Sequence, residues 1–417
     1  MKKLKAIQSY VPFNAGLDPD ACMGKPYTYL AMLSGLQLKK LYGEVTLYTN
    51  NSMGEFFDRL NFPHTIDTSL EGEGGEYFAM PKLKAFMKQD KPFVHFDLDS
   101  LVFQKPAVWE KDSPYVFSHP DMPNNGYDKV DRRYPKKKHK TVNALIQDVW
   151  FDNLMESYLL AFYNCESLPE DYPSHLINPN NIPNMNIIGV KNPEVFKEAT
   201  KIAMEIADKN KHIFTNNWLA SNFIEQLTIP LYLEVLDEDY KNALKAHKEK
   251  NPKGSPFTFA GDPFTCLGFP EDEPKWQNLI PPYPFKFQHF YQCGECLDWH
   301  KTKHLIDSDE SLYKGLDLSQ YKFCHIGGGN KDYALWQAMV IHTIVENYGE
   351  QHVLDITEFY RIKDEGANKR LKYINVSFKE KNRHYQGIGK KELLKREINS
   401  LKYIRRYFVE YQLWLKL

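Results

Sequence analysis

The stretch that decides the fold reads Pro92-Phe93-Val94-His95-Phe96-Asp97-Leu98-Asp99-Ser100-Leu101-Val102-Phe103. Its apolar residues mark a buried strand, and two carboxylates stand two residues apart within it. Because residues i and i+2 of an extended segment point to the same side, Asp97 and Asp99 are expected to converge on one divalent cation. A turn with two solvated acids is the plainer alternative, but polar turns are rarely embedded in an apolar run. The stretch therefore predicts a metal or catalytic site.

The segments before this stretch alternate between strand-like and helical patterns. Strand-like runs and helical spacing alternate over residues 5–11, 27–41, 44–49, 54–60, 64–68 and 77–89, beginning with a strand. Such alternation predicts βαβ units and a parallel sheet, in which residues 93–103 form about the fourth strand. Ligands of open α/β sheets bind at the carboxyl ends of the strands. Asp97 and Asp99 are therefore expected in a ligand-binding position.

The pattern after the stretch is looser but keeps strands and helices in alternation. Asn192-Pro193 supplies an N-cap and first turn for a helix over residues 194–208. Further elements are expected as a strand ending at 190, a helix at 215–227, a strand at 231–236, a strand at 321–325 and a helix at 333–347. The predicted fold class is α/β, with an irregular insertion over residues 251–319 and a C-terminal helical tail.

Length and composition are those of an ordinary globular protein. The chain has 417 residues, of which 42% are hydrophobic, 14% aromatic and 26% charged, and its formal net charge is −1. This length exceeds what one hydrophobic core usually supports, so we expect one large α/β domain with an appended region, or two domains. Balanced charge argues against a nucleic-acid coat protein. The sequence has no signal-peptide pattern and no run of about 18 apolar residues, which predicts a cytoplasmic protein.

Six scattered cysteines favour reduced thiols over a disulfide framework. Cys293 and Cys296, followed by His300 and His304, have a spacing found in zinc sites, but a second Cys-x-x-Cys pair is absent from the sequence. The sequence therefore allows two interpretations of these cysteines, a zinc site or ordinary free thiols.

A second informative motif is His325-Ile326-Gly327-Gly328-Gly329-Asn330-Lys331, which follows a short strand-like run and precedes a helical one. The imidazole can bind a metal, the glycines let backbone N–H groups approach phosphate oxygens, and the lysine can neutralise phosphate charge. A glycine turn before a helix, with a surface lysine, is the plainer alternative. Each part of the motif suits a metal-bound diphosphate.

Asp97-Leu98-Asp99 and His325-x-x-Gly328-x-x-Lys331 resemble the two motifs of GT-A-fold nucleotide-sugar glycosyltransferases, nearest to glycosyltransferase family 8. The resemblance covers residues 1–335 and departs from that family after the lysine, where Asp332-Tyr333 stands in place of Pro-Trp. It implies a GT-A-like, Rossmann-type central sheet flanked by helices. It also implies sugar transfer from a nucleotide-sugar donor, most often UDP-linked, with retention of the anomeric configuration.

The resemblance also implies roles for individual residues. Asp97, Asp99 and His325 would bind Mn²⁺ or Mg²⁺, and the ion would stabilise the leaving diphosphate as a Lewis acid. Donor binding would involve Lys82, Lys84, Asp97, Gly328 and Lys331. The residues expected near the reacting carbon are Glu225, Gln226 and Asn186. For Glu225 and Gln226, a solvated pair on a helix is the plainer alternative.

Two basic segments indicate what kind of molecule could accept the sugar and whether the protein contacts a membrane. Residues 132–140 hold a dense basic run, and residues 379–417 carry eleven Lys or Arg against four Glu, beside an apolar stripe. These features suit an anionic glycan or lipid-linked acceptor and peripheral contact with the inner membrane face. A tail packed on the main domain or on a partner subunit fits equally well, and nucleic acid is the least favoured partner. The expected domains are 1–345, catalytic, with a nucleotide-binding half at 1–110 and an acceptor and metal-completing half at 111–345, then a basic helical region at 346–417.

Two other functions fit parts of the sequence. The segment Phe96-Asp97-Leu98-Asp99-Ser100-Leu101-Val102 also resembles the first motif of haloacid-dehalogenase-like phosphohydrolases, in which the first aspartate, here Asp97, is the nucleophile. That motif generally lies on the first strand, whereas several α/β units precede it here. The other alternative is a non-enzymatic protein that binds membranes or nucleic acid through its basic tail.

Overall fold

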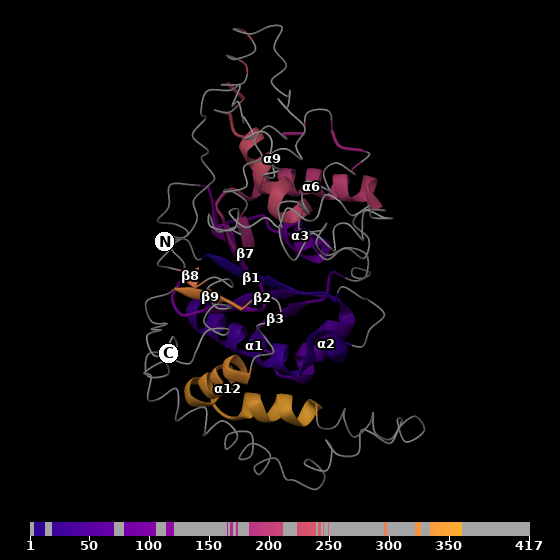
Figure 1. The fold of residues 1–417 in the computed structure, drawn as a ribbon. Coiled ribbons are helices and arrows are strands. Elements are labelled where there is room, and N and C mark those ends of the chain that lie inside the picture. Colours follow the sequence, from indigo (N-terminus) through magenta and orange to yellow (C-terminus); the bar gives the residue numbers. More distant parts are fainter. Residues whose placement is uncertain are drawn as a thin grey trace, which may run out of the picture.

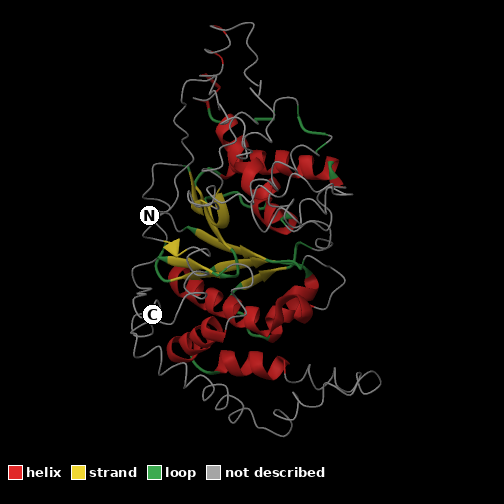
Figure 2. Ribbon diagram, in the orientation of Figure 1, coloured by secondary structure: helices red, strands yellow, loops and turns green. Residues whose placement is uncertain are grey.

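The computed structural model describes residues 4–12, 19–70, 79–105, 114–120, 183–211, 223–238, 322–326 and 334–360, together with isolated positions between them. These residues form a mixed α/β fold with a mostly parallel central sheet and helices on both faces (Figure 1). Figure 2 shows the strands as a layer between two groups of helices. The α/β class expected from the sequence is confirmed.

The central sheet orders its strands β3-β2-β1-β4-β7-β6. Their bounds are β1 Lys5–Ser9, β2 Val45–Tyr48, β3 Thr65–Asp67, β4 Phe93–Phe96, β6 Tyr115–Pro120 and β7 Pro183–Val190. Strands β3, β2, β1 and β4 pair in parallel, whereas β7 runs antiparallel to both β4 and β6. A helix connects each consecutive pair in the parallel half, as parallel pairing requires a long crossover.

One face of the sheet is covered by α1 (Pro19–Tyr42) and α2 (Asn51–Arg59). In an outer layer, α12 (Ala334–Tyr348) and a further helix over residues 351–360 pack on α1 (Figure 1). Asn50 begins α2 as its N-cap, because its side chain accepts a hydrogen bond from the Met53 N–H. Gly24 interrupts α1 with a φ of 63°, a left-handed conformation that glycine adopts readily. Pro26 then stands in the first turn of the long part of α1, where its missing N–H costs nothing.

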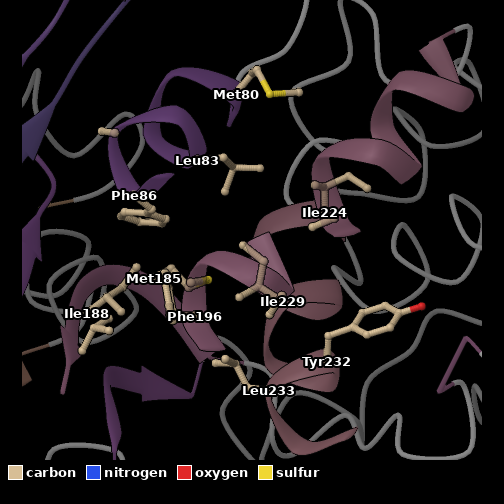
Figure 3. Packing of buried hydrophobic residues seen from close by; sticks show 14 of the residues in the cluster. Met80, Leu83, Phe86, Met185, Ile188, Phe196, Ile224, Ile229, Tyr232 and Leu233 are labelled. Carbon is tan, nitrogen blue, oxygen red and sulfur yellow. The ribbon is translucent and has the colours of Figure 1, made fainter. Parts of the chain in front are cut away.

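The opposite face is covered by α3 (Met80–Met87), α6 (Pro193–Lys209), η5 (Phe223–Thr228) and α9 (Ile229–Val235). Figure 3 shows apolar side chains from these helices and from β7 meeting in one cluster, among them Phe86, Met185, Phe196 and Ile224. The rings of Phe86 and Phe196 contact edge to face with centroids 5.3 Å apart. This cluster fixes α3 and η5 against the sheet, and both helices carry candidate site residues.

The strand expected at residues 231–236 is wrong, because this segment is the helix α9. Leu231, Tyr232 and Leu233 are all buried in the cluster between the helices. A short apolar run that is buried on every side has no periodicity, so its sequence does not distinguish a helix from a strand.

The single strand expected over residues 93–103 is also wrong. Residues 97–100 turn, and the chain passes from β4 into β5 (Ser100–Val102) of a second sheet. That sheet has the order β5-β9-β8, with β9 at Phe323–His325 and β8 at Cys296–Leu297. Leu98, in the turn, is only 1% exposed. The run is therefore apolar because the turn itself is buried, and not because all of its residues form one extended strand.

Several expectations lie outside the described residues: Gly328, Lys331, Cys293, the basic run at 132–140 and the tail beyond residue 360. The boundary expected at residue 345 stays a prediction. Past it, the helix over 351–360 packs on α1, where the hydroxyls of Tyr360 and Thr28 lie 2.8 Å apart. Of the helices that the structure describes, none is both long and apolar enough to cross a membrane.

Candidate functional site

A tight turn over residues 97–100, the Asp97 turn, joins β4 to β5 at the carboxyl end of β4. The Ser100 N–H donates to the Asp97 carbonyl oxygen at 3.1 Å, which closes the turn. The Asp97 N–H donates to the carbonyl oxygen of Asn186 on β7 at 2.7 Å. The expectation that strand alternation aligns Asp97 with Asp99 is therefore wrong. A turn anchored to the central sheet presents the two carboxylates instead.

The pairing of β5 with β9 brings His325 to this turn. Ser100 is the register partner of His325, and the Ile326 N–H donates to the Asp99 carbonyl oxygen at 3.1 Å. Nε2 of His325 lies 3.7 Å from Oδ1 of Asp99, and the two side chains are 10% and 11% exposed. Two motifs that stand far apart in the sequence thus meet at one point of the fold.

Lys82, on α3, holds the other side of the turn. Its ammonium lies 2.8 Å from Oδ1 of Asp97 and 2.6 Å from Oε1 of Glu225, and it donates to the Met185 carbonyl oxygen at 2.8 Å. An ammonium has three N–H donors, so these three acceptors account for all of them. The side chains of Lys82 and Glu225 are 12% and 4% exposed, whereas that of Asp97 is 30% exposed. Asp97 is therefore the member of this ion-pair network that faces solvent.

The charges at the site favour an added cation. Burial raises the pKa of Asp97 to about 7; Lys82 opposes this shift, while repulsion from Asp99 and Glu225 adds to it. Burial lowers the pKa of Lys82, but the charges of Asp97 and Glu225 outweigh it and raise that pKa above its ordinary value. Asp97 thus has two like charges close to it, those of Asp99 and Glu225, and one ammonium, that of Lys82, so a cation added beside it would favour its ionised form.

Glu225 and Asn186, two of the residues proposed from the sequence, both lie beside the Asp97 turn. Glu225 lies on η5, a π-helical turn of a kind often found at functional sites, and it is buried and not solvated. Asn186 on β7 donates from its side-chain amide to Oγ of Ser100 at 3.1 Å, which fixes the end of the Asp97 turn. Gln226, beside Glu225, is also buried, yet Glu225 is the one of the two that binds Lys82.

The structure distinguishes Lys82 from Lys84. The two lysines are two residues apart on α3, which rotates their side chains by about 200° around the helix axis. Lys82 points to Asp97 and Glu225, so Lys84 leaves α3 in a different direction. Of the two lysines proposed from the sequence, Lys82 is the one at the site.

Ser9, His95 and Asp97 stand in a row that resembles a catalytic triad. Oγ of Ser9 lies 3.0 Å from Nε2 of His95, while Nδ1 of His95 lies 3.8 Å from Oδ1 of Asp97. The second distance is too long for a hydrogen bond, and Lys82 binds the same carboxylate oxygen. His95 is fully buried, and burial together with the charge of Lys82 lowers its pKa well below the usual value. We therefore read His95 as a buried structural residue.

Several residues that touch the site were missed in the sequence. Gln8, near the carboxyl end of β1, donates to the Asp97 carbonyl oxygen at 3.4 Å, and the Met185 carbonyl binds Lys82. A backbone carbonyl gives no signal in a sequence. Gln8 and His95 do give one, because a polar residue inside a buried parallel strand must find a partner there.

The donor set can be tested against a divalent ion. Two carboxylates and an imidazole suit Mn²⁺, which accepts oxygen and nitrogen ligands. Within the described residues, no group of three His, Cys, Asp or Glu side chains is placed to hold a metal by itself. Asp99 and His325 meet, whereas Asp97 is bound to Lys82. The residues fit an ion whose remaining ligands come from elsewhere, such as the phosphate oxygens of a bound nucleotide.

Comparison with known proteins identifies one family model, described as a family of unknown function (DUF6734), which matches residues 22–155. This match runs from α1 past β6 and contains Lys82, Asp97 and Asp99, whereas Glu225 and His325 lie beyond it. Neither a curated protein nor a solved structure matches the chain. The chain is therefore similar, over less than half of its length, to a family whose function is not known.

Proposed function

We propose that this protein is a metal-dependent glycosyltransferase with a GT-A-like fold. It would move a sugar from a nucleotide-sugar donor, of the UDP-linked class, to a glycan or lipid-linked acceptor with retention of configuration. The observation that carries the proposal is the 3.7 Å approach of His325 to Asp99. It supports the proposal because the two motifs that resemble those of family 8 meet at the carboxyl end of β4, where α/β sheets bind ligands.

The charge of the site supports a diphosphate donor that arrives with a divalent ion. Asp97, Asp99 and His325 would hold Mn²⁺ or Mg²⁺, and Asp97 has the solvent-facing carboxylate. The ion, when bound, supplies Lewis-acid stabilisation of the leaving diphosphate. Gly328 and Lys331 remain proposed donor ligands on the basis of the sequence motif alone.

Lys82 takes a more limited part in this proposal than the sequence suggested. Its three donors are bound to Asp97, Glu225 and Met185, so it would position the two carboxylates and not bind the diphosphate directly. Glu225 is held beside the turn by this contact. It would face the reacting sugar as an acidic group whose orientation is already fixed, which favours catalysis by preorganisation.

The proposal is tested by calorimetric titration of the full chain with Mn²⁺ and a panel of nucleoside diphosphate sugars. We expect a uridine-linked donor to bind in the presence of Mn²⁺, and Asp99→Ala and His325→Ala to weaken it about tenfold or more. Asp208→Ala on α6 and His352→Ala on the helix over 351–360 are matched controls away from the site, and both should bind like the wild type.

Two results would count against the transferase. Binding of no sugar nucleotide, or equal binding by Asp99→Ala and His325→Ala, would remove its basis. Phosphate release from sugar phosphates that is lost in Asp97→Asn would instead favour the phosphohydrolase alternative.

A further inference from the structure

A buried polar chain runs through the core from β3 to the Asp97 turn. His64 precedes β3, and its Nε2 lies 2.7 Å from Oε1 of Gln8, near the carboxyl end of β1. The Gln8 side-chain amide donates to Oγ of Ser34 on α1 at 3.1 Å and to the Asp97 carbonyl oxygen at 3.4 Å. Gln8 and Ser34 are fully buried, and His64 is 8% exposed. These contacts join three elements behind the turn.

The orientation of the Gln8 amide follows from its partners. The Asp97 carbonyl can only accept a hydrogen bond, so the NH₂ group of Gln8 must face it. The Gln8 oxygen then faces His64, and because that oxygen can only accept, Nε2 of His64 must carry a proton. Exchange of the Gln8 oxygen and nitrogen would set two carbonyl oxygens against each other. The Asp97 carbonyl therefore fixes the orientation of the Gln8 amide, and Gln8 in turn fixes which nitrogen of His64 carries the proton.

The Asp97 carbonyl lies at the start of the turn that presents both proposed ligands. It accepts from the Ser100 N–H, which closes the turn, and from Gln8, which attaches the turn to β1. Gln8 pairs in register with Phe96, the residue before the turn. A donor on β1 thus fixes the direction of the peptide group from which the Asp97 side chain branches.

We infer that Gln8, held from behind by its hydrogen bond with His64, is a positioning residue that keeps the Asp97 turn in the geometry of the proposed metal site. This inference rests on the proposed function, because it concerns the same cation site. Groups that orient metal ligands through hydrogen bonds commonly change metal affinity by about 10-fold to 100-fold when they are removed. Gln8 would act in this way through the backbone of a ligand.

The experiment compares Gln8→Met with Ser34→Ala in the full chain. Gln8→Met keeps the size of the side chain but removes its donors, whereas Ser34→Ala removes a buried hydrogen bond of Gln8 without touching the turn. We expect Gln8→Met to weaken Mn²⁺ binding, measured by calorimetry, about 10-fold to 100-fold, and Ser34→Ala to change it by less than about threefold. His64→Gln restores a donor to Gln8 and should bind Mn²⁺ better than His64→Phe does.

Amide hydrogen exchange of residues 97–102, measured without metal, gives a second readout of the same variants. We expect faster exchange there in Gln8→Met than in Ser34→Ala, after correction for the global stability of each. Equal exchange and equal Mn²⁺ affinity in the two variants would overturn the role of Gln8. If the wild type binds no Mn²⁺, the proposed function fails, and the exchange comparison alone decides whether Gln8 holds the turn.

Discussion

Lys82 is the side chain that links the two carboxylates on the α3 side of the site. It lies between Asp97 and Glu225 and is almost buried, so its ammonium is the counter-charge that the two acids share. Removing one partner of a buried charge pair leaves an uncompensated charge and commonly costs about 3–5 kcal/mol. Lys82 is therefore expected to matter for stability as well as for function.

We expect Lys82→Met to lower the free energy of unfolding in urea by about 3–5 kcal/mol, while Lys84→Met, two residues away on the same helix, stays within about 1 kcal/mol of the wild type. Adding Glu225→Gln to Lys82→Met should recover part of the loss, because the buried Glu225 carboxylate then no longer lacks a cation. Equal unfolding curves for the two lysine variants would contradict the network that we describe.

His64 makes the stability of the fold depend on pH, and a substitution at this residue can measure that contribution. Burial, with a smaller contribution from the charge of Lys39, lowers the pKa of His64 to about 3, against an ordinary value of 6.5. The unfolded chain therefore binds a proton at a higher pH than the native chain does. The stability from this residue is complete above about pH 6.5 and is lost as pH falls toward 3, by at most about 1.4 kcal/mol per pH unit.

Chemical unfolding of His64→Gln at several pH values tests whether His64 makes the protein less stable as the pH falls. Between pH 4 and 6 the variant should lose stability less steeply than the wild type does, by up to about 1.4 kcal/mol per pH unit. A variant with the same slope as the wild type would show that His64 is already protonated in the native protein, or that it does not titrate on unfolding.

Residue types in the sequence predicted part of this site. Asp97, Asp99 and His325 are chemically distinctive, and the structure brings Asp99 and His325 together as expected. Met185 escaped prediction because it acts through its backbone carbonyl, whereas Gln8, a polar residue in a buried strand, indicated a buried partner without showing which one. The choice between Lys82 and Lys84 depended on the rotation of α3 relative to the sheet, which single residues do not reveal.

At the scale of elements, the order of strands and helices in the first hundred residues was predictable, because apolar residues recur at different intervals in helices and in strands. The predictions were wrong where a segment is buried on all sides, since nearly every residue is then apolar and no interval can be recognised. Residues 93–103 read as one apolar strand although the chain turns at 97–100, and residues 231–236 read as a strand although they form α9. The antiparallel direction of β7 and the pairing of β5 with β9 depend on contacts between distant segments, which local patterns do not encode.

The packing of α1 on the segment before β3 supports the buried polar chain. Gly35 on α1 faces the Phe62 ring, and a Cβ at this position would lie 2.9 Å from its nearest ring carbon and 3.0 Å from Cγ of Pro63. Phe62 in turn contacts the His64 ring edge to face, with centroids 4.9 Å apart. A side chain at Gly35 would therefore push away the segment that carries His64.

This contact predicts that Gly35→Ala destabilises the protein, although the change would ordinarily favour a helix by about 1 kcal/mol. Overpacking costs about 1–3 kcal/mol, so the net loss in the free energy of unfolding should be up to about 2 kcal/mol. Phe62→Leu should relieve the contact, so the double variant should be more stable than the two single changes predict by addition. A more stable Gly35→Ala protein would show that the segment yields without cost.

At the scale of the whole molecule, the proposed site is assembled from distant parts of the chain. The β1 to β4 half supplies Asp97 and Asp99, β9 supplies His325, and η5 on the other face of the sheet supplies Glu225. The family of unknown function matches the segment that holds Asp97 and Asp99, and it reaches neither β9 nor η5. The central claim is therefore that the Asp97 turn and His325 act as one cation site.

The most direct test is pulsed electron paramagnetic resonance of Mn²⁺ bound to the full chain with uridine diphosphate, because it detects a coordinating imidazole nitrogen. We predict a nitrogen coupling in the wild type that disappears in His325→Ala and persists in the control His352→Ala, and loss of the bound ion in Asp99→Ala. Mn²⁺ that binds without a nitrogen coupling, or with one that persists in His325→Ala, would contradict the account.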